Sequence, residues 1–296
     1  NGDYNEFYMT QLREVLGNPK YGNNGKFVEV WMDGAKGSGA AAQHYKFDQW
    51  FDLIEELQPG AVVFSPYATG VRWIGNESGK AGDPAWSKID KKRIRDRYDQ
   101  GLGDDNRYLN NGDPQGDIWS VGECDVSLTS GWFWHQGNGP KTMEQLTEIY
   151  FKSVGRGQPL LLNVAPDRNG HFTTEDIARI KEFSTAINNT FDENLATPNT
   201  TTAEASSVRG NSMNFSASKV LDDDHDSYWT MDDGQTTGSI TIDLGEEKTF
   251  DVISIEEYIK LGQRVSEFSV EVFTNGSWKN FGNGKTIGAK RLVRNS

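Results

Sequence analysis

Strand-like apolar runs alternate with amphipathic stretches over the first 195 residues of the chain. The strand-like runs are short and bounded by turn residues; they lie at 26–33, 61–66, 117–128 and 159–167. The other stretches carry apolar residues at helical spacing; they lie at 3–18, 45–60, 142–157 and 174–191. In the first of them, Phe7, Leu12, Val15 and Leu16 are expected on one apolar face. This alternation predicts parallel strands with helices outside them, as in a barrel or a doubly wound sheet.

The segments that follow the strands favour the barrel. Functional residues of a (β/α) barrel lie at the carboxyl ends of its strands, and acidic, Gly-rich segments follow the strand-like runs here. We therefore expect the α/β class, with a (β/α)8-type, TIM-like barrel in residues 1–195.

The pattern changes near residue 195. A Thr- and Ser-rich stretch without apolar periodicity is followed by segments that alternate with period two at 239–245, 250–259 and 268–278. Asn275-Gly276 is a hairpin signal inside the last of them. Residues 196–296 are therefore expected to form an all-β sandwich domain.

Charge and cysteine content exclude several functions. A formal net charge of −13 and a pI near 4.8 argue against nucleic acid and anionic membrane surfaces as partners. Cys124 is the single cysteine, which excludes an internal disulfide framework and a multi-Cys metal site. No stretch approaches the length of a membrane span, and no signal peptide is visible.

Two carboxylates stand out because each follows a strand-like apolar run and enters a Gly-rich loop: Asp33 in FVEVWMDGA and Glu77 in GVRWIGNESGKAG. Such carboxylates contribute nothing to a core and suggest chemistry. Nearby Trp31 and Trp73 offer flat apolar faces on which sugar rings stack. Taken singly, Asp33 is also consistent with a helix cap, Glu77 with a solvated loop charge, and the tryptophans with core packing.

The motifs WMDGA and RWIGNESG resemble glycoside hydrolase family 29, the retaining α-L-fucosidases. The second motif is similar to the subfamily that prefers α-1,3/1,4-linked fucose. The resemblance extends through GECDVSLTSGWFWH and PLLLNVAPDRNG and covers most of residues 1–195. It implies that Asp33 is the nucleophile and Glu77 the acid/base, without a cofactor. It also places Trp31, Arg72, Trp73 and Trp132 at the substrate.

The chemistry of a retaining glycosidase agrees with these roles. It needs two carboxyl groups about 5–5.5 Å apart, one ionised to attack and one protonated to release the leaving group. We expect Arg72 to keep Asp33 ionised, and Trp73 with an apolar pocket to keep Glu77 protonated. Glu123 and Asp125 alternate with Cys124 and so share one strand face. Both are candidate substrate-binding residues that line either the pocket or the barrel interior.

One departure from the family concerns its consecutive histidine pair, which helps to grip fucose. The four histidines of this chain, at 44, 135, 171 and 225, are not adjacent. The chain therefore resembles the second half of the barrel, and the expected partner is the missing N-terminal half.

The C-terminal motifs VLDDDHDSYWTMDDG, SITIDLG and RVSEFSVEVFTNGSW are similar to discoidin-like, F5/8 type C modules, including family 32 carbohydrate-binding modules. Here too the resemblance implies truncation, at the C-terminal end. Related modules often hold calcium, for which Asp222, Asp224 and Ser227 would supply oxygen ligands. A solvated turn is the alternative.

Together these observations predict a retaining α-L-fucosidase acting on fucosylated oligosaccharides or glycans in a periplasmic or extracellular setting. Two alternatives remain open: a non-catalytic carbohydrate-binding protein that uses the sandwich, and a retaining glycosidase for another sugar.

Overall fold

A computed structural model of the chain describes residues 3–33, 44–65, 70–95 and 106–294. Their contacts divide the chain into two compact units. The first contains Asn1–Ser127 and Gln158–Asn163, and the second contains Leu128–Gly157 and Val164–Ser296. The division expected from composition, at residue 195, differs from this one and stays a prediction.

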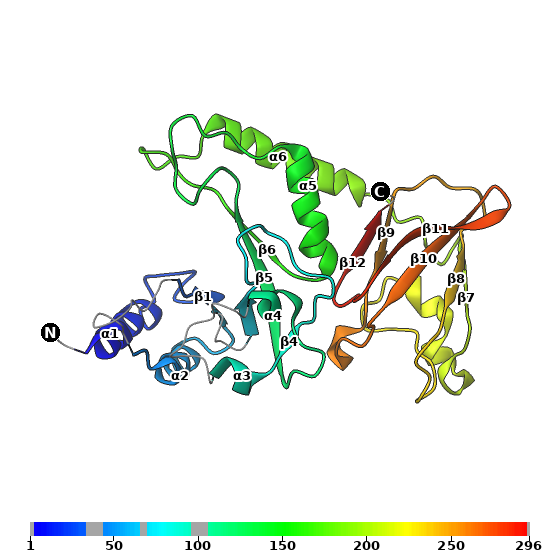
Figure 1. Cartoon of the computed structure of the whole chain (residues 1–296), viewed down its shortest axis with the longest axis horizontal. Coiled ribbons are helices and arrows are strands. Elements are labelled where there is room, and N and C mark those ends of the chain that lie inside the picture. The colour runs from blue at the N-terminus through cyan, green and yellow to red at the C-terminus, as the bar shows by residue number, and fades with distance from the viewer. Residues whose placement is uncertain (1–2, 34–43, 66–69, 96–105, 295–296) are drawn as a thin grey trace. The chain divides into compact units, whose positions relative to one another are not determined.

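The first unit is built on a sheet of six strands (Figure 1). The strands are β1 (Glu29–Trp31), β2 (Val62–Phe64), β3 (Gly70–Trp73), β4 (Lys88–Ile89), β5 (Ile118–Ser127) and β6 (Leu160–Asn163). Five of them, β1, β2, β3, β5 and β6, are parallel neighbours in that order, whereas β4 pairs antiparallel with the beginning of β5. Parallel strands that adjoin in chain order form a half-barrel sheet.

The described residues of this unit form four helices: α1 (Tyr4–Leu16), α2 (Phe47–Leu57), α3 (Lys91–Arg95) and α4 (Asn106–Asn111). The carboxylate of Asp3 caps α1 by accepting a hydrogen bond from the backbone N–H of Asn5. The sequence pattern placed Phe7 and Val15 on the buried face of α1, and this was wrong. Both are exposed, because only the row through Leu12 and Leu16 meets α2.

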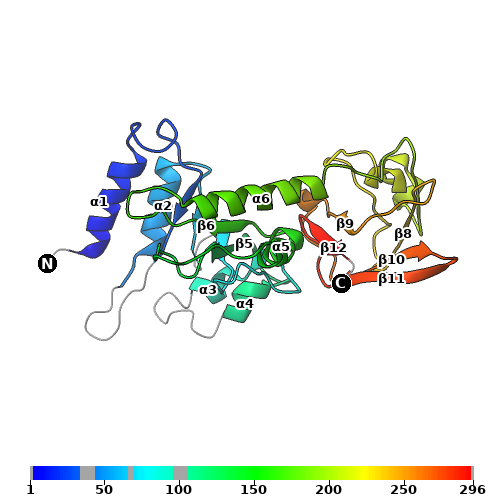
Figure 2. The same cartoon turned by 90° about the horizontal axis from the view of Figure 1, so that it is seen from above.

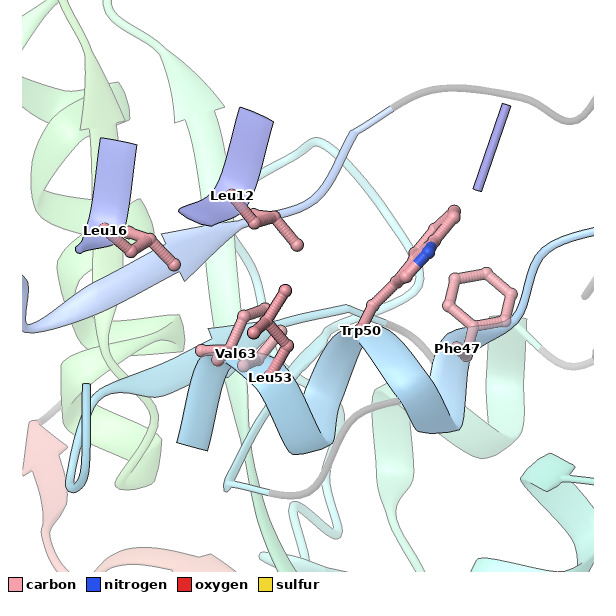
Figure 3. Packing of buried hydrophobic residues seen from close by; sticks show 7 residues of the cluster. Leu12, Leu16, Phe47, Trp50, Leu53 and Val63 are labelled. Atoms are coloured by element: carbon pink, nitrogen blue, oxygen red, sulfur yellow. The ribbon is translucent and has the colours of Figure 1, made fainter. Parts of the chain in front are cut away.

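The helices α1 and α2 cover one face of the sheet. A continuous apolar core joins them to β2 (Figure 3), and it consists of Leu12, Leu16, Phe47, Trp50, Leu53, Ile54 and Val63. Val30 of β1 packs against the same core. Since neighbouring residues of a strand point to opposite faces, Trp31 and Phe64 lie on the other face.

That other face carries the candidate chemistry. In parallel register, Trp31 pairs with Phe64, and Trp73 of β3 pairs with Glu123 of β5. Asp125 follows two positions after Glu123 and therefore points to the same side. The sheet thus presents aromatic rings and carboxylates together on the face that α1 and α2 leave uncovered.

The second unit contains two long helices, α5 (Met143–Lys152) and α6 (Thr174–Thr190), shown from above in Figure 2. Thr142 and Gln145 form a capping box at the start of α5, and Thr173 caps α6. The rings of Tyr150 and Phe183 meet edge to face between the two helices, with centroids 6.1 Å apart. A 3-10 turn, η2 (Val154–Arg156), follows α5.

The rest of this unit is made of antiparallel strand pairs and short 3-10 turns. The strands are β7 (Thr202–Ala205) with β8 (Ile240–Asp243), β9 (Val252–Ile255) with β12 (Arg291–Arg294), and β10 (Phe268–Thr274) with β11 (Ser277–Gly284). The 3-10 turns are η3 (Arg209–Asn211), η4 (Met213–Phe215), η5 (Ala217–Val220) and η6 (Ile259–Leu261). Asn275 and Gly276 join β10 to β11 with φ of 52° and 76°, which confirms the hairpin signal.

Candidate active site

Asp33 lies immediately beyond the carboxyl end of β1. The ladder continues one step past the strand, because the backbone N–H of Met32 donates to the carbonyl of Phe64 over 3.0 Å. This step directs the chain past the edge of the sheet, and the side chain of Asp33 is exposed there. A carboxylate at this end of a parallel strand lies where barrel enzymes carry their catalytic groups.

Glu77 lies in the loop that follows β3, and its side chain is also exposed. Gly75 permits this loop, because it has φ of 84° and a Cβ there would lie 2.4 Å from the carbonyl oxygen of Asn106. The backbone N–H of Gly79 donates to the carbonyl of Asp125 over 3.2 Å. The Glu77 loop is therefore attached to the end of β5.

The pKa of Asp125 responds to both candidate catalytic acids. Burial raises the pKa of Asp125 to about 6, and the charges of Glu77 and Asp33 both add to this rise. The indole of Trp73 donates a hydrogen bond to the same carboxylate and opposes the rise. The charges of two acids, one after β1 and one after β3, thus both act on the carboxyl group of Asp125.

The carboxylate of Asp125 is 2% exposed, and its Oδ1 has no hydrogen-bond partner among the residues that the structure describes. An unpaired buried acceptor is costly unless a ligand or water completes it. Asp125 therefore remains available to accept a hydrogen bond at the site.

Glu123 lies two positions before Asp125 on β5 and accepts a hydrogen bond from Trp31. The indole Nε1–H of Trp31 donates to Oε1 of Glu123 over 3.2 Å. Burial raises the pKa of Glu123 to about 7, helped by the charges of Glu29 and Asp125 and opposed by the hydrogen bond from Trp31. The ring of Trp31 also stacks on Phe64, with centroids 4.3 Å apart and planes 9° from parallel.

Sequence reasoning missed two of these residues. Glu29 points to the same face as Trp31, burial raises its pKa, and its Oε1 has no partner in the part of the chain that is described. Phe64 supports the Trp31 ring from β2. Strand alternation from Trp31 would have identified Glu29, whereas nothing in the sequence pairs Phe64 with Trp31.

Arg72 is not brought to the carboxylates. Its side chain is fully buried on the opposite face of β3, where it donates to the backbone carbonyls of Leu109 and Trp86 over 2.8 Å each and to that of Ser120. The reason is strand alternation, which points Arg72 away from the side of Trp73. We therefore correct the expectation that Arg72 keeps Asp33 ionised or contacts substrate: this guanidinium links β3 to β5, to α4 and to the backbone of Trp86.

Trp132 belongs to the second unit, where it is half-buried in the segment between β5 and α5. The two units are described separately, so Trp132 is not placed relative to Asp33 or Glu77. Its role stays a prediction from the resemblance.

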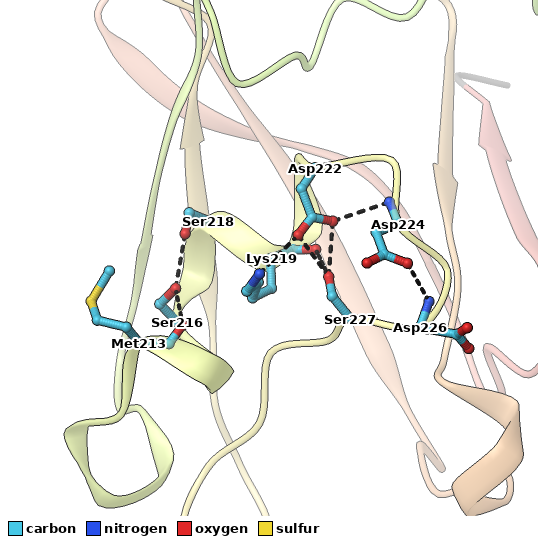
Figure 4. Close-up of polar contacts among 8 residues, drawn as sticks. All are labelled: Met213, Ser216, Ser218, Lys219, Asp222, Asp224, Asp226 and Ser227. Atoms are coloured by element: carbon cyan, nitrogen blue, oxygen red, sulfur yellow. Dashed lines mark hydrogen bonds and ion pairs between the residues drawn. The ribbon is translucent and has the colours of Figure 1, made fainter.

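The residues expected to bind calcium lie in the second unit (Figure 4). The carboxylate of Asp222 accepts from the hydroxyl of Ser227 over 2.8 Å and from the ammonium group of Lys219 over 3.2 Å. Asp224 instead accepts from the backbone N–H of Asp226. Among the described residues no group of three His, Cys, Asp or Glu side chains is arranged to hold a metal ion. Lys219 therefore pairs with the Asp222 carboxylate in this structure, and calcium binding by Asp222, Asp224 and Ser227 stays a prediction.

The chain is similar to proteins of known family. Residues 202–296 match the F5/8 type C domain family. The chain is 40% identical to "Alpha-L-fucosidase 1" of Arabidopsis thaliana over 99% of its own length and 56% of that protein. The chain therefore spans little more than half of this relative.

Solved structures of GH29 proteins also match nearly the whole chain. The crystal structure of SpGH29 matches 99% of this chain with 63% of its own, at 44% identity and a TM-score of 0.90. A Ruminococcus gnavus GH29 fucosidase in complex with fucose matches 99% of this chain with 60% of its own, at 45% identity and a TM-score of 0.89. The expected fold class, a half of a TIM-like barrel followed by a β-domain, is confirmed.

Proposed function

Because the resemblance to glycoside hydrolase family 29 is confirmed over nearly the whole chain, we propose that this protein is an α-L-fucosidase that works by double displacement. Asp33 is the nucleophile and Glu77 the acid/base. One observation carries these roles: the charges of Asp33 and Glu77 both act on Asp125 at the carboxyl end of β5. Glycosidases of both stereochemical classes use two carboxyl groups about the scissile bond, and retention needs them about 5–5.5 Å apart.

The reaction follows from these two groups. The carboxylate of Asp33 attacks the anomeric carbon while the glycosidic C–O bond breaks, and Glu77 gives its proton to the leaving oxygen. Glu77 then takes a proton from water, whose oxygen attacks the anomeric carbon and releases Asp33 as a carboxylate. Proton and charge are restored after each turnover, so the cycle runs without a cofactor.

Aromatic side chains provide the sugar contacts in this proposal. Trp31 is 40% exposed and lies two positions before Asp33, and Trp73 lies four positions before Glu77. Trp132 joins them on the resemblance alone. Asp125 offers its unpaired Oδ1 to a sugar hydroxyl, with Glu123 beside it. The motif around Glu77 supports α-1,3/1,4-linked fucose on oligosaccharides or glycans as substrate.

A preceding half barrel is the proposed partner of the sheet. The Arabidopsis relative is nearly twice as long as the part matched here. In the described part of the chain, β1 pairs with β2 alone, which leaves its other edge open. Open edges and an uncovered face of a parallel sheet are normally covered in a complete barrel.

No specific observation favours either alternative, the non-catalytic carbohydrate-binding protein or the retaining glycosidase for another sugar. Residues 202–296 match the F5/8 type C domain family, and the similar proteins are named as fucosidases. None of the described helices has the length and apolar character to cross a membrane. A periplasmic or extracellular setting and a structural calcium ion stay predictions.

The test is hydrolysis of an aryl α-L-fucoside by the parent chain and by Asp33→Ala and Glu77→Ala. Proton NMR of the first sugar released reports the anomer, and retention is expected. Glu55→Ala, an exposed acid on α2, is the matched control and should keep the parent rate. Inversion, or activity in Asp33→Ala equal to that of the control, would contradict the proposal.

A further inference from the structure

Two tryptophans near the proposed catalytic acids bond to the same strand. Trp31 donates its indole N–H to Glu123, and Trp73 donates its indole N–H to Asp125. The two acceptors are alternate residues of β5 and therefore point to one face. The indole rings of Trp31 on β1 and Trp73 on β3 are therefore bonded to carboxylates two positions apart on β5.

The ring of Trp31 is held at two places. Phe64 covers one ring face at a centroid distance of 4.3 Å, and Glu123 holds the N–H edge at 3.2 Å. Phe64 is 3% exposed and Glu123 is 7% exposed, so both supports lie inside the unit. Trp31 itself stays 40% exposed. A ring fixed from behind and at its edge has lost its rotamer freedom before a sugar arrives.

We propose that Glu123 is a positioning residue, which orients the ring of Trp31 for the sugar through the Nε1–H···Oε1 bond and does not itself contact the sugar. The inference deepens the proposed function and rests on it. Its support is geometric: Oε1 of Glu123 is already occupied, and the exposed group of the pair is the tryptophan. The charge of Glu29 on β1 also acts on Glu123.

Kinetics of a double-mutant cycle separates positioning from direct sugar contact. Glu123→Gln keeps an oxygen acceptor and should behave as the parent chain. Glu123→Leu removes the acceptor and should raise KM about 3- to 10-fold, the range of one hydrogen bond, with kcat changed less. In a Trp31→Phe background, which has no indole N–H, Glu123→Leu should have no further effect.

Two results would overturn the proposal. If Glu123→Gln is as impaired as Glu123→Leu, the charge of Glu123 matters and the accepted hydrogen bond does not. If Glu123→Leu has its full effect in the Trp31→Phe background, Glu123 acts without the ring.

A second measurement is independent of turnover. The chain has 9 tryptophans, so a ¹H–¹⁵N spectrum resolves their indole signals, and the Trp31 signal is the one that Trp31→Phe removes. Glu123→Leu should shift this signal, speed its exchange with water and weaken L-fucose binding followed at it. Glu123→Gln should do none of these. An unmoved Trp31 signal in Glu123→Leu sinks the positioning role, whereas a parent chain that binds fucose without hydrolysis contradicts only the proposed function.

Discussion

The indole N–H of Trp31 donates a hydrogen bond to Oε1 of Glu123, 92 positions later in the chain, over 3.2 Å. The bond crosses from β1 to β5, with β2 and β3 between them in the sheet. Long side chains on one face of a curved parallel sheet can meet in this way, as in the interior of a barrel. The half barrel therefore already gathers an aromatic ring and carboxylates from separate strands.

The acid role of Glu77 predicts a dependence on the leaving group. Glu77→Gln cannot donate a proton, so hydrolysis of an alkyl or sugar α-L-fucoside should fall about 10²- to 10⁴-fold. A dinitrophenyl fucoside, whose leaving group needs no protonation, should lose much less in its first step. Steady-state and burst kinetics on both substrates check this. Equal losses on the two substrates would remove Glu77 from the acid role.

Glu123 predicts a pH dependence of stability. Its pKa is raised to about 7 from 4.5, so the folded state binds more protons than the unfolded state between these values. Stability from this group is therefore fully present below about pH 4.5 and is lost as pH rises through 7. Glu123→Gln should flatten this fall by roughly 1–2 kcal/mol. Urea unfolding at pH 5 and pH 8 measures it, and a slope equal to that of the parent contradicts it.

Arg72 predicts a loss of stability without a specific effect on sugar binding. Arg72→Met leaves the carbonyls of Leu109, Ser120 and Trp86 without their donor, which should cost roughly 3–5 kcal/mol. Thermal unfolding measures this, with Lys92→Met on the exposed side of α3 as the control. At a temperature where both variants are folded, KM should equal that of the parent. A raised KM with unchanged stability would return Arg72 to the sugar site.

The corrected face of α1 predicts two unequal substitutions. Leu12→Ala removes a buried side chain from the core with α2 and should destabilise this chain by about 2–5 kcal/mol. Phe7→Ala, at a position that is 59% exposed, should change stability by less than about 0.5 kcal/mol. Chemical denaturation of the two variants compares them directly. Similar losses would restore the face that the periodicity indicated.

The helices and strands with a clear apolar periodicity could be predicted from the sequence. The helices α2, α5 and α6 and the strands β1, β2, β5 and β6 follow from periodicity and end signals. The short elements β4 and α3 do not, because pairing with β5 and local turns create them. Resemblance then supplied the family, and the motifs located Asp33 and Glu77.

The sequence alone determined which residues end each strand, and therefore that two acids and two tryptophans lie near the carboxyl ends of parallel strands. Only the tertiary structure decided what each group meets. In the structure, Arg72 donates to backbone carbonyls of α4, β5 and Trp86, Trp31 donates to Glu123, and the charges of Asp33 and Glu77 act on Asp125. The physical reason is that periodicity gives the side of a strand, whereas contacts between distant strands depend on register, and register is set by the packing of the whole sheet.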